Sequence, residues 1–264
     1  MKKSLLSSAA LVLGIITVIL VWYSVALKIN SDLLAPTPLT VCRELLAALK
    51  EKSVYKSIIG TFSRSMISFL IAFVVALIMA VAANASAFLE KLFYPLVALL
   101  RVLPAMAAIL LCLIWLKSAK SPIAISFIVV FPMMYSAMLS AIKNRDRETA
   151  ELLKVYGVKP VKVFWGCTLP NVFEKIFPEI ISLLAFNVKL TVSGEALANT
   201  QLSIGREMYV ANAYLETGRL MAFAVIAVLL SVIIEVVVKL IYKTVRGAIV
   251  GYERKKSEQA LQNG

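Results

Sequence analysis

The chain has 264 residues, of which 61% are hydrophobic and only 16% are charged, and its formal net charge is +13. A water-soluble domain of this length cannot bury so much apolar surface, so the composition excludes that class and indicates a membrane protein. The sequence has no histidine and its three cysteines lie far apart. We therefore expect no metal or cofactor site and no disulfide framework in this chain.

Six stretches are long and apolar enough to cross a bilayer, which requires ~20 mostly apolar residues. They predict membrane spans at about residues 5–27, 65–89, 92–116, 121–142, 176–198 and 220–241. These runs are continuous, whereas a membrane β-barrel shows short alternating segments. We expect an all-α, polytopic membrane protein in which residues 1–264 form a single transmembrane domain.

The distribution of Lys and Arg predicts the orientation of these spans. If the N-terminus is cytosolic, the inner segments carry sixteen basic residues and the outer segments carry ten. The positive-inside rule then favours an N-in, C-in topology in the cell membrane. Because this asymmetry accounts for the positive charge, no nucleic-acid partner is expected.

The first apolar run has a second interpretation, a signal peptide cleaved near Ala26. Its length of about 23 residues exceeds the usual 7–15-residue apolar core of a signal peptide. We therefore expect the run to remain as the first span.

The segment after the first span predicts a short helix on the outer side. Thr37 can cap a helix that begins at Pro38 and continues to about Lys50. Its apolar residues recur at helical spacing and predict the face that packs against the bundle, with anchoring to the membrane surface as the alternative. These residues are Leu39, Cys42, Leu45, Leu46 and Leu49.

The second, third and fourth spans differ in composition. The second is rich in Ala and Ser, which favours close helix packing inside the bundle. The third and fourth contain Pro104 and Pro132, each of which predicts a helix kink. Such kinks suit a pathway that opens and closes, but they are also common in membrane helices generally.

Farther along the chain, between the last two spans, Ser203 can cap a short helix on the outer side.

Three charged residues fall deep within predicted spans: Arg101, Lys189 and Glu195. Each costs about 2.5–3.5 kcal/mol at a helix centre on insertion scales, so each requires a reason. Arg101 or Lys189 could face a water-filled translocation pathway, or either could form a structural ion pair with Glu195. The sequence favours the ion pair. Arg64 is expected to anchor the outer end of the second span.

The predicted cytosolic loop, residues 143–175, combines charged and apolar residues. Its pattern indicates two short helices that meet at Gly157, which can end the first helix in the left-handed conformation. Pro160 favours the first turn of the second helix. The apolar residues must rest either on the membrane surface or against a partner protein. The predicted contact residues are Glu148, Glu151, Leu152, Leu153, Val155, Tyr156, Gly157, Val158 and Pro160.

This loop resembles that of the permease subunits of ATP-binding-cassette importers. In that family a glutamate is followed by a glycine six residues later and a proline thirteen residues beyond it, as are Glu151, Gly157 and Pro170 here. The two residues after the glutamate are usually alanine but are leucine in this chain. Further segments resemble the nitrate, sulfonate and taurine branch of the family: Leu34–Pro38, Arg64–Phe69, Leu100–Ala105 and Val188–Glu195.

The resemblance implies a permease that forms a dimer, a homodimer as first expectation, and binds two cytosolic ATPase subunits through this loop. It also implies a solute-binding protein outside the cell membrane and a small anionic solute such as a sulfonate. The chain has no Gly-rich phosphate loop, so ATP is expected to be used by the partner subunits. Two alternatives are an ion-coupled secondary transporter and a membrane scaffold that docks a cytosolic partner.

Overall fold

The computed structural model describes residues 2–144 and 169–262, and all regular structure within these two ranges is helical. Five of the helices are long and apolar enough to cross a membrane, and a sharply bent pair makes up to six. The prediction of an all-α, polytopic membrane protein is confirmed. In these ranges the helices are α1 (Lys2–Ile29), α2 (Pro38–Ala48), α3 (Lys52–Ala85), α4 (Ala87–Val102), α5 (Ala105–Trp115), α6 (Ser121–Lys143), α9 (Leu169–Ala198), α10 (Ile204–Ala213) and α11 (Thr217–Gln262).

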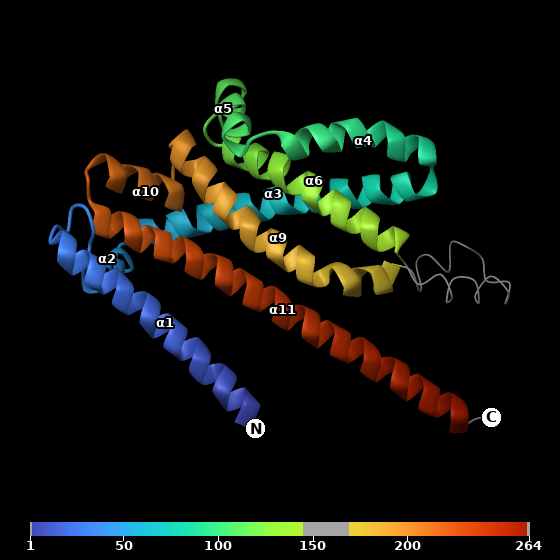
Figure 1. Ribbon diagram of the computed structural model, residues 1–264. Helices are drawn as coiled ribbons and strands as arrows, with labels where there is room; N and C mark the ends of the chain where they lie inside the picture. The colour runs from blue at the N-terminus through green and yellow to red at the C-terminus, as the bar shows by residue number, and fades with distance from the viewer. Residues whose placement is uncertain (1, 145–168, 263–264) are drawn as a thin grey trace.

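The long helices run back and forth between two ends of the molecule (Figure 1). The short helices α2 and α10 lie at one end, where α3 and α11 begin. At the opposite end α6 finishes and α4 and α9 begin. We call these the outer end and the inner end, after the orientation that the basic residues predict.

Several helices extend beyond the predicted spans. The second span begins at Lys52 rather than at residue 65, the fifth begins at Leu169, and the last continues to Gln262. Hydropathy marks only the apolar part of a helix, whereas backbone hydrogen bonding continues into polar turns at either end. The predicted loop 143–175 is correspondingly shorter, because its last seven residues belong to α9.

The third span is broken rather than kinked, which corrects the prediction for Pro104. Helix α4 ends at Val102, α5 begins at Ala105, and the two helices meet at 99°. A proline disfavours helical geometry in the residue before it, and Leu103 has φ −59° and ψ 120°. Two consecutive non-helical residues therefore separate the helices. Pro132, in contrast, lies inside α6, which continues through it without interruption.

Small residues of α3 form the centre of the bundle, as predicted for the second span. Fully or nearly fully buried positions recur along one face of this helix, which packs along α6 and α9. Close approach of this kind supplies the van der Waals contact that holds helices together in lipid. The buried small residues are Ser57, Thr61, Ser65, Ser68, Ala72, Ala76, Ala80 and Ala83.

Helix α2 has the predicted cap but not the predicted packing face. The Thr37 hydroxyl accepts the N–H of Thr40 at 3.2 Å. Leu39 and Leu46 are exposed, whereas Val41 and Ala48 are buried at the side that meets α11. Of the predicted face only Leu45 packs against the core, where it is half-buried, because the packed face of α2 is centred on the smaller residues Val41 and Ala48.

Candidate translocation pathway

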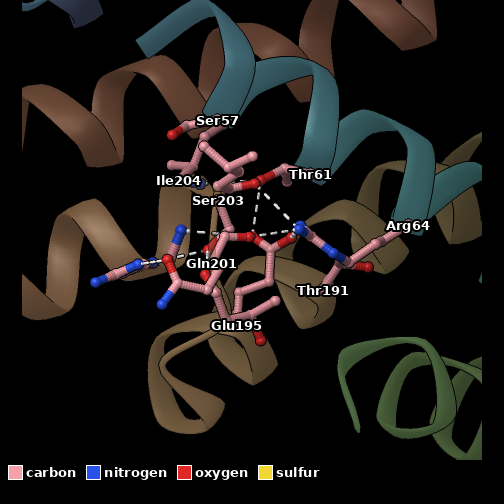
Figure 2. A network of polar contacts seen from close by, with 12 residues as sticks. Ser57, Thr61, Arg64, Thr191, Glu195, Gln201, Ser203 and Ile204 are labelled. Carbon is pink, nitrogen blue, oxygen red and sulfur yellow. Dashed lines mark hydrogen bonds and ion pairs between the residues drawn. The ribbon is translucent and has the colours of Figure 1, made fainter. Parts of the chain in front are cut away.

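An ion pair between Arg64 of α3 and Glu195 of α9 lies at the centre of a polar network near the outer end (Figure 2). The guanidinium nitrogen Nη1 is 2.5 Å from Oε1 of the carboxylate, and Glu195 is fully buried. The other carboxylate oxygen accepts the Thr61 hydroxyl at 2.7 Å and the Gly205 N–H at 3.4 Å. Three helices, α3, α9 and α10, therefore meet on one carboxylate.

The same network holds the link between α9 and α10. Arg64 Nη2 donates to the carbonyl oxygens of Gln201 and Leu202, at 2.8 and 3.0 Å. The Thr61 hydroxyl also accepts the Ile204 N–H at 3.0 Å. Leu202 has a positive φ of 50°, which is unfavourable for a residue with a side chain. These hydrogen bonds stabilise that conformation from the α3 side.

Two glycines allow this close approach. A Cβ atom at Gly60 of α3 would overlap the carbonyl oxygen of Leu202. A Cβ atom at Gly205 of α10 would lie 2.5 Å from the Ala196 nitrogen and 2.5 Å from the Glu195 Cβ. Real Cβ atoms do not come so near to other heavy atoms, so only glycine fits at either position without a shift of the helices.

A second buried polar layer lies one to two turns deeper. The Asn187 amide of α9 donates to the Ser65 carbonyl at 2.8 Å and to the Ser65 hydroxyl at 3.0 Å. Its oxygen accepts the Ser68 hydroxyl at 3.1 Å. Ser126 of α6 and Thr191 of α9 share a further hydrogen bond of 2.9 Å. In the part of the chain that the structure describes, no buried side-chain polar atom lacks a partner.

Replacing Asn187 with alanine is expected to destabilise the bundle by about 1–2 kcal/mol, the value of an interhelical hydrogen-bonding residue in lipid. The change removes three hydrogen bonds between α9 and α3. Thermal unfolding in detergent measures this effect. The exposed Ser193 of α9 bonds only within its own helix, to the Lys189 carbonyl, and Ser193→Ala is the matched control with no expected change.

The inner half of the bundle contains two open cavities. A cavity of about 740 Å³ lies between α4, α6 and α9. A second cavity of about 460 Å³ lies between α4 and α6. Arg101, Ser136 and Ser140 line both cavities and form a polar wall between them. The second cavity reaches the ion pair of Glu90 and Lys143 at the inner end, where the two charged atoms are 2.5 Å apart.

The structure brings Glu195 together with Arg64, not with Lys189 or Arg101, which corrects the predicted ion pair. Lys189 lies six residues before Glu195 on the same helix, so the two side chains leave it in different directions, and Lys189 is exposed. Arg101 lies on α4 and donates to the Ser136 hydroxyl of α6. Of the three predicted charges, only Arg101 lines the two inner cavities.

Two acidic residues near the inner ends of their helices, Glu179 of α9 and Glu235 of α11, each have a lysine four positions away, and one of the two pairs with it. Lys239 lies 2.5 Å from Glu235, four residues earlier on α11. Within the described ranges, Glu179 forms no ion pair with Lys175. Both residues instead line the larger cavity. The neighbouring Glu174 of α9 pairs with Arg246 of α11.

The predicted ATPase-contact residues Glu148–Pro160 fall within residues 145–168 and lie outside the described residues. Their role stays a prediction from the sequence. The described structure places the two helices that flank this segment side by side at the inner end, because α6 ends at Lys143 and α9 begins at Leu169.

Comparison with known proteins identifies the class of this molecule. The family model of the binding-protein-dependent transport system inner membrane component matches residues 55–247, and the chain belongs to this family. The chain is also 24% identical, over 226 residues, to the taurine transport system permease protein TauC of Escherichia coli (strain K12). That similarity covers 82% of this chain and 82% of the relative.

These findings confirm the resemblance that Glu151, Gly157 and Pro170 indicate. The chain is a permease subunit of an ATP-binding-cassette importer and is related to the taurine, sulfonate and nitrate branch. It is a transport subunit rather than an enzyme, and a multi-pass protein of the inner membrane. Its family implies an ATPase and a solute-binding protein as partners.

Proposed function

We propose that this permease imports a small sulfonate-like anion, delivered by a solute-binding protein on the outer side. A homodimer of the chain and two ATPase subunits would complete the transporter, and the ATPase subunits would use the ATP. The similarity to a taurine permease over 82% of both chains supports this solute class. Nitrate and other small organic anions are the neighbouring possibilities, and the solute-binding protein would choose between them.

The observation that carries the mechanism is the contrast between the two halves of the bundle. In the outer half, α3, α9 and α10 meet in the buried network around Glu195, and the pocket of about 340 Å³ between α2 and the start of α11 shares no lining residue with that network. The inner half contains cavities of about 740 and 460 Å³. This arrangement fits an inward-facing state of a transporter that alternates between two shapes. Outward opening would then require α9 and α10 to move relative to α3 at the Arg64–Glu195 ion pair.

We further propose that the segment 145–168 transmits the movement of the ATPase subunits to α6 and α9. The two flanking helices pack along each other and contribute the walls of the larger cavity. A displacement of segment 145–168 would therefore move both α6 and α9, which form two walls of the larger cavity. The residues Glu151 and Gly157 are the proposed centre of the ATPase contact.

Reversing the charge at Glu151 with lysine, or replacing Gly157 with proline, is expected to reduce ATPase association about tenfold or more, a loss of about 1.4 kcal/mol of binding free energy. ATP-dependent uptake is expected to fall with it. Copurification of the ATPase subunit and uptake into vesicles are the two measurements. Unchanged association and unchanged uptake in both variants would show that this segment is not the coupling contact.

The matched control is Glu216→Lys, which makes the same charge reversal at an exposed position of the outer end. It is expected to leave ATPase association unchanged. A loss of association in this control as well would point to a general effect of charge on folding or insertion.

A further inference from the structure

The guanidinium of Arg101 is held in position by a hydrogen bond to an uncharged side chain. It donates to the Ser136 hydroxyl, and that hydroxyl in turn donates to the Pro132 carbonyl at 2.8 Å. Among the described residues, Arg101 forms no ion pair. Its positive charge is therefore held in position, and no carboxylate of residues 2–144 or 169–262 pairs with it, whereas Arg64 pairs with Glu195.

The position of Arg101 is deep and central. It lies eleven residues along α4 from Glu90, which corresponds to ~16 Å at ~1.5 Å per residue. This distance is about half the ~30 Å thickness of the hydrocarbon core of a bilayer. Arg101 lines both inner cavities and lies in the last turn of α4, away from the inner end, so a solute that entered these cavities would meet it.

Among the residues that the structure describes, the charges that line the two cavities leave an excess of one positive charge. Arg101, Lys175 and Lys143 are the cations, and Glu179 and Glu90 are the carboxylates. Glu90 and Lys143 neutralise each other in their ion pair. Ser136 and Ser140, one helical turn apart on α6, add hydroxyl groups beside the guanidinium. A guanidinium with nearby hydroxyls is suited to the oxygens of an oxyanion.

We infer that Arg101 is the group that selects anions in the translocation pathway, and that it binds the oxyanion headgroup of the passing solute while Ser136 positions it. The inference rests on the proposed import function and adds a specificity-determining residue inside the permease. The absence of a neutralising carboxylate on Arg101, within the described residues, leaves the site open to an anion. Its exposure in the inner cavities also allows the anion to leave.

The test measures the charge preference of the cavity without the ATPase or the solute-binding protein. Cys42, Cys112 and Cys167 are replaced, and Ser140→Cys places a thiol about 6 Å from Ser136, the spacing of residues one helical turn apart. The permease in lipid vesicles is then treated with anionic 2-sulfonatoethyl or cationic 2-(trimethylammonium)ethyl methanethiosulfonate. The ratio of the two modification rates reports the electrostatic potential at Ser140.

Arg101→Gln is expected to lower the anionic-to-cationic rate ratio by about fivefold to tenfold at low salt, from Coulomb's law for a unit charge ~6–9 Å from the thiol in water. Arg101→Lys is expected to retain most of the ratio because it retains the charge. Lys120→Gln, a neutralisation in the exposed link between α5 and α6, is expected to leave the ratio unchanged. An equal ratio in the Arg101→Gln variant and in the chain that keeps Arg101, or failure of both reagents to reach position 140, overturns the inference.

A second arm keeps Arg101 in place, so that it does not depend on the folding of a variant at that position. Sodium methanesulfonate is expected to slow modification of the Ser140→Cys chain at least about threefold more than sodium chloride at the same ionic strength, since an oxyanion makes directed hydrogen bonds with a guanidinium. Neutral dimethyl sulfone, of similar shape, is expected to have no effect. Equal effects of the three compounds overturn the proposed oxyanion site.

These measurements distinguish a failure of the Arg101 inference from a failure of the proposed import function. An equal charge preference with and without Arg101, together with intact ATP-dependent uptake by the unmodified chain, would refute the role of Arg101 alone. A strong charge preference in a chain that supports no ATP-dependent uptake would refute the import function but leave an anion-attracting cavity.

Discussion

Replacement of Glu195 with alanine is expected to produce one of the two largest losses of stability in this chain, about 3–5 kcal/mol, because it leaves a partly buried guanidinium without its carboxylate. Arg64 is only 15% exposed in its side chain, and Glu195 is fully buried. The change also removes the acceptor of the Thr61 hydroxyl and of the Gly205 N–H. Thermal unfolding of the purified permease, followed by tryptophan fluorescence, is the measurement.

Lys189→Ala on the same helix is the matched control, with an expected change within about 0.5 kcal/mol because this side chain is exposed. The double variant Arg64→Met, Glu195→Leu is expected to regain much of the lost stability, since no unpaired charge remains. Wild-type stability of Glu195→Ala would contradict the structural role of the ion pair. A double variant as unstable as the sum of the two single changes would contradict their coupling.

Gly205→Ala is the second change with a large expected effect, a destabilisation of about 1–3 kcal/mol from overpacking. The added Cβ would lie 2.5 Å from the Glu195 Cβ and from the Ala196 nitrogen, so α10 must move away from α9. That movement separates the Gly205 N–H from the Glu195 carboxylate and weakens the polar network that joins α3, α9 and α10. We expect the variant to unfold at a lower temperature and to show faster solute leakage in vesicles.

Gly14→Ala in α1 is the control for this substitution, because nothing lies within 4 Å of a Cβ at that position. It is expected to be neutral, or more stable by about 0.5–1 kcal/mol through helix propensity. If Gly14→Ala and Gly205→Ala have the same effect, the close approach of α9 and α10 is not what stabilises the outer end.

The fold was largely predictable because lipid imposes a strong rule on sequence. The runs around α1, α3, α6, α9 and α11 are long and apolar, and each is a helix. The small residues along α3, such as Ala72 and Ala76, correctly indicated burial. The break at Leu103 was not predicted, because one proline is compatible with a kink or a break, and the choice depends on the packing of both halves.

The site was less predictable because charge partners depend on three-dimensional position. The sequence singled out Glu195 as a buried charge but could not show that Arg64, 131 positions away in the chain, would meet it. Gly60 and Gly205 gave a weak indication of close helix contact, since each is an isolated glycine in a helix. Arg101 carried a stronger one, a charge within an apolar run that required a water-filled space or a partner.

The central claim is ATP-driven import through this permease, and uptake into proteoliposomes tests it most directly. The vesicles would contain the chain with its cognate ATPase subunit, and the cognate binding protein would be added with the radiolabelled solute that it retains. The account predicts accumulation that requires ATP and the binding protein and is lost in Glu151→Lys. Accumulation driven by a proton or sodium gradient, without ATP or the ATPase, would contradict it.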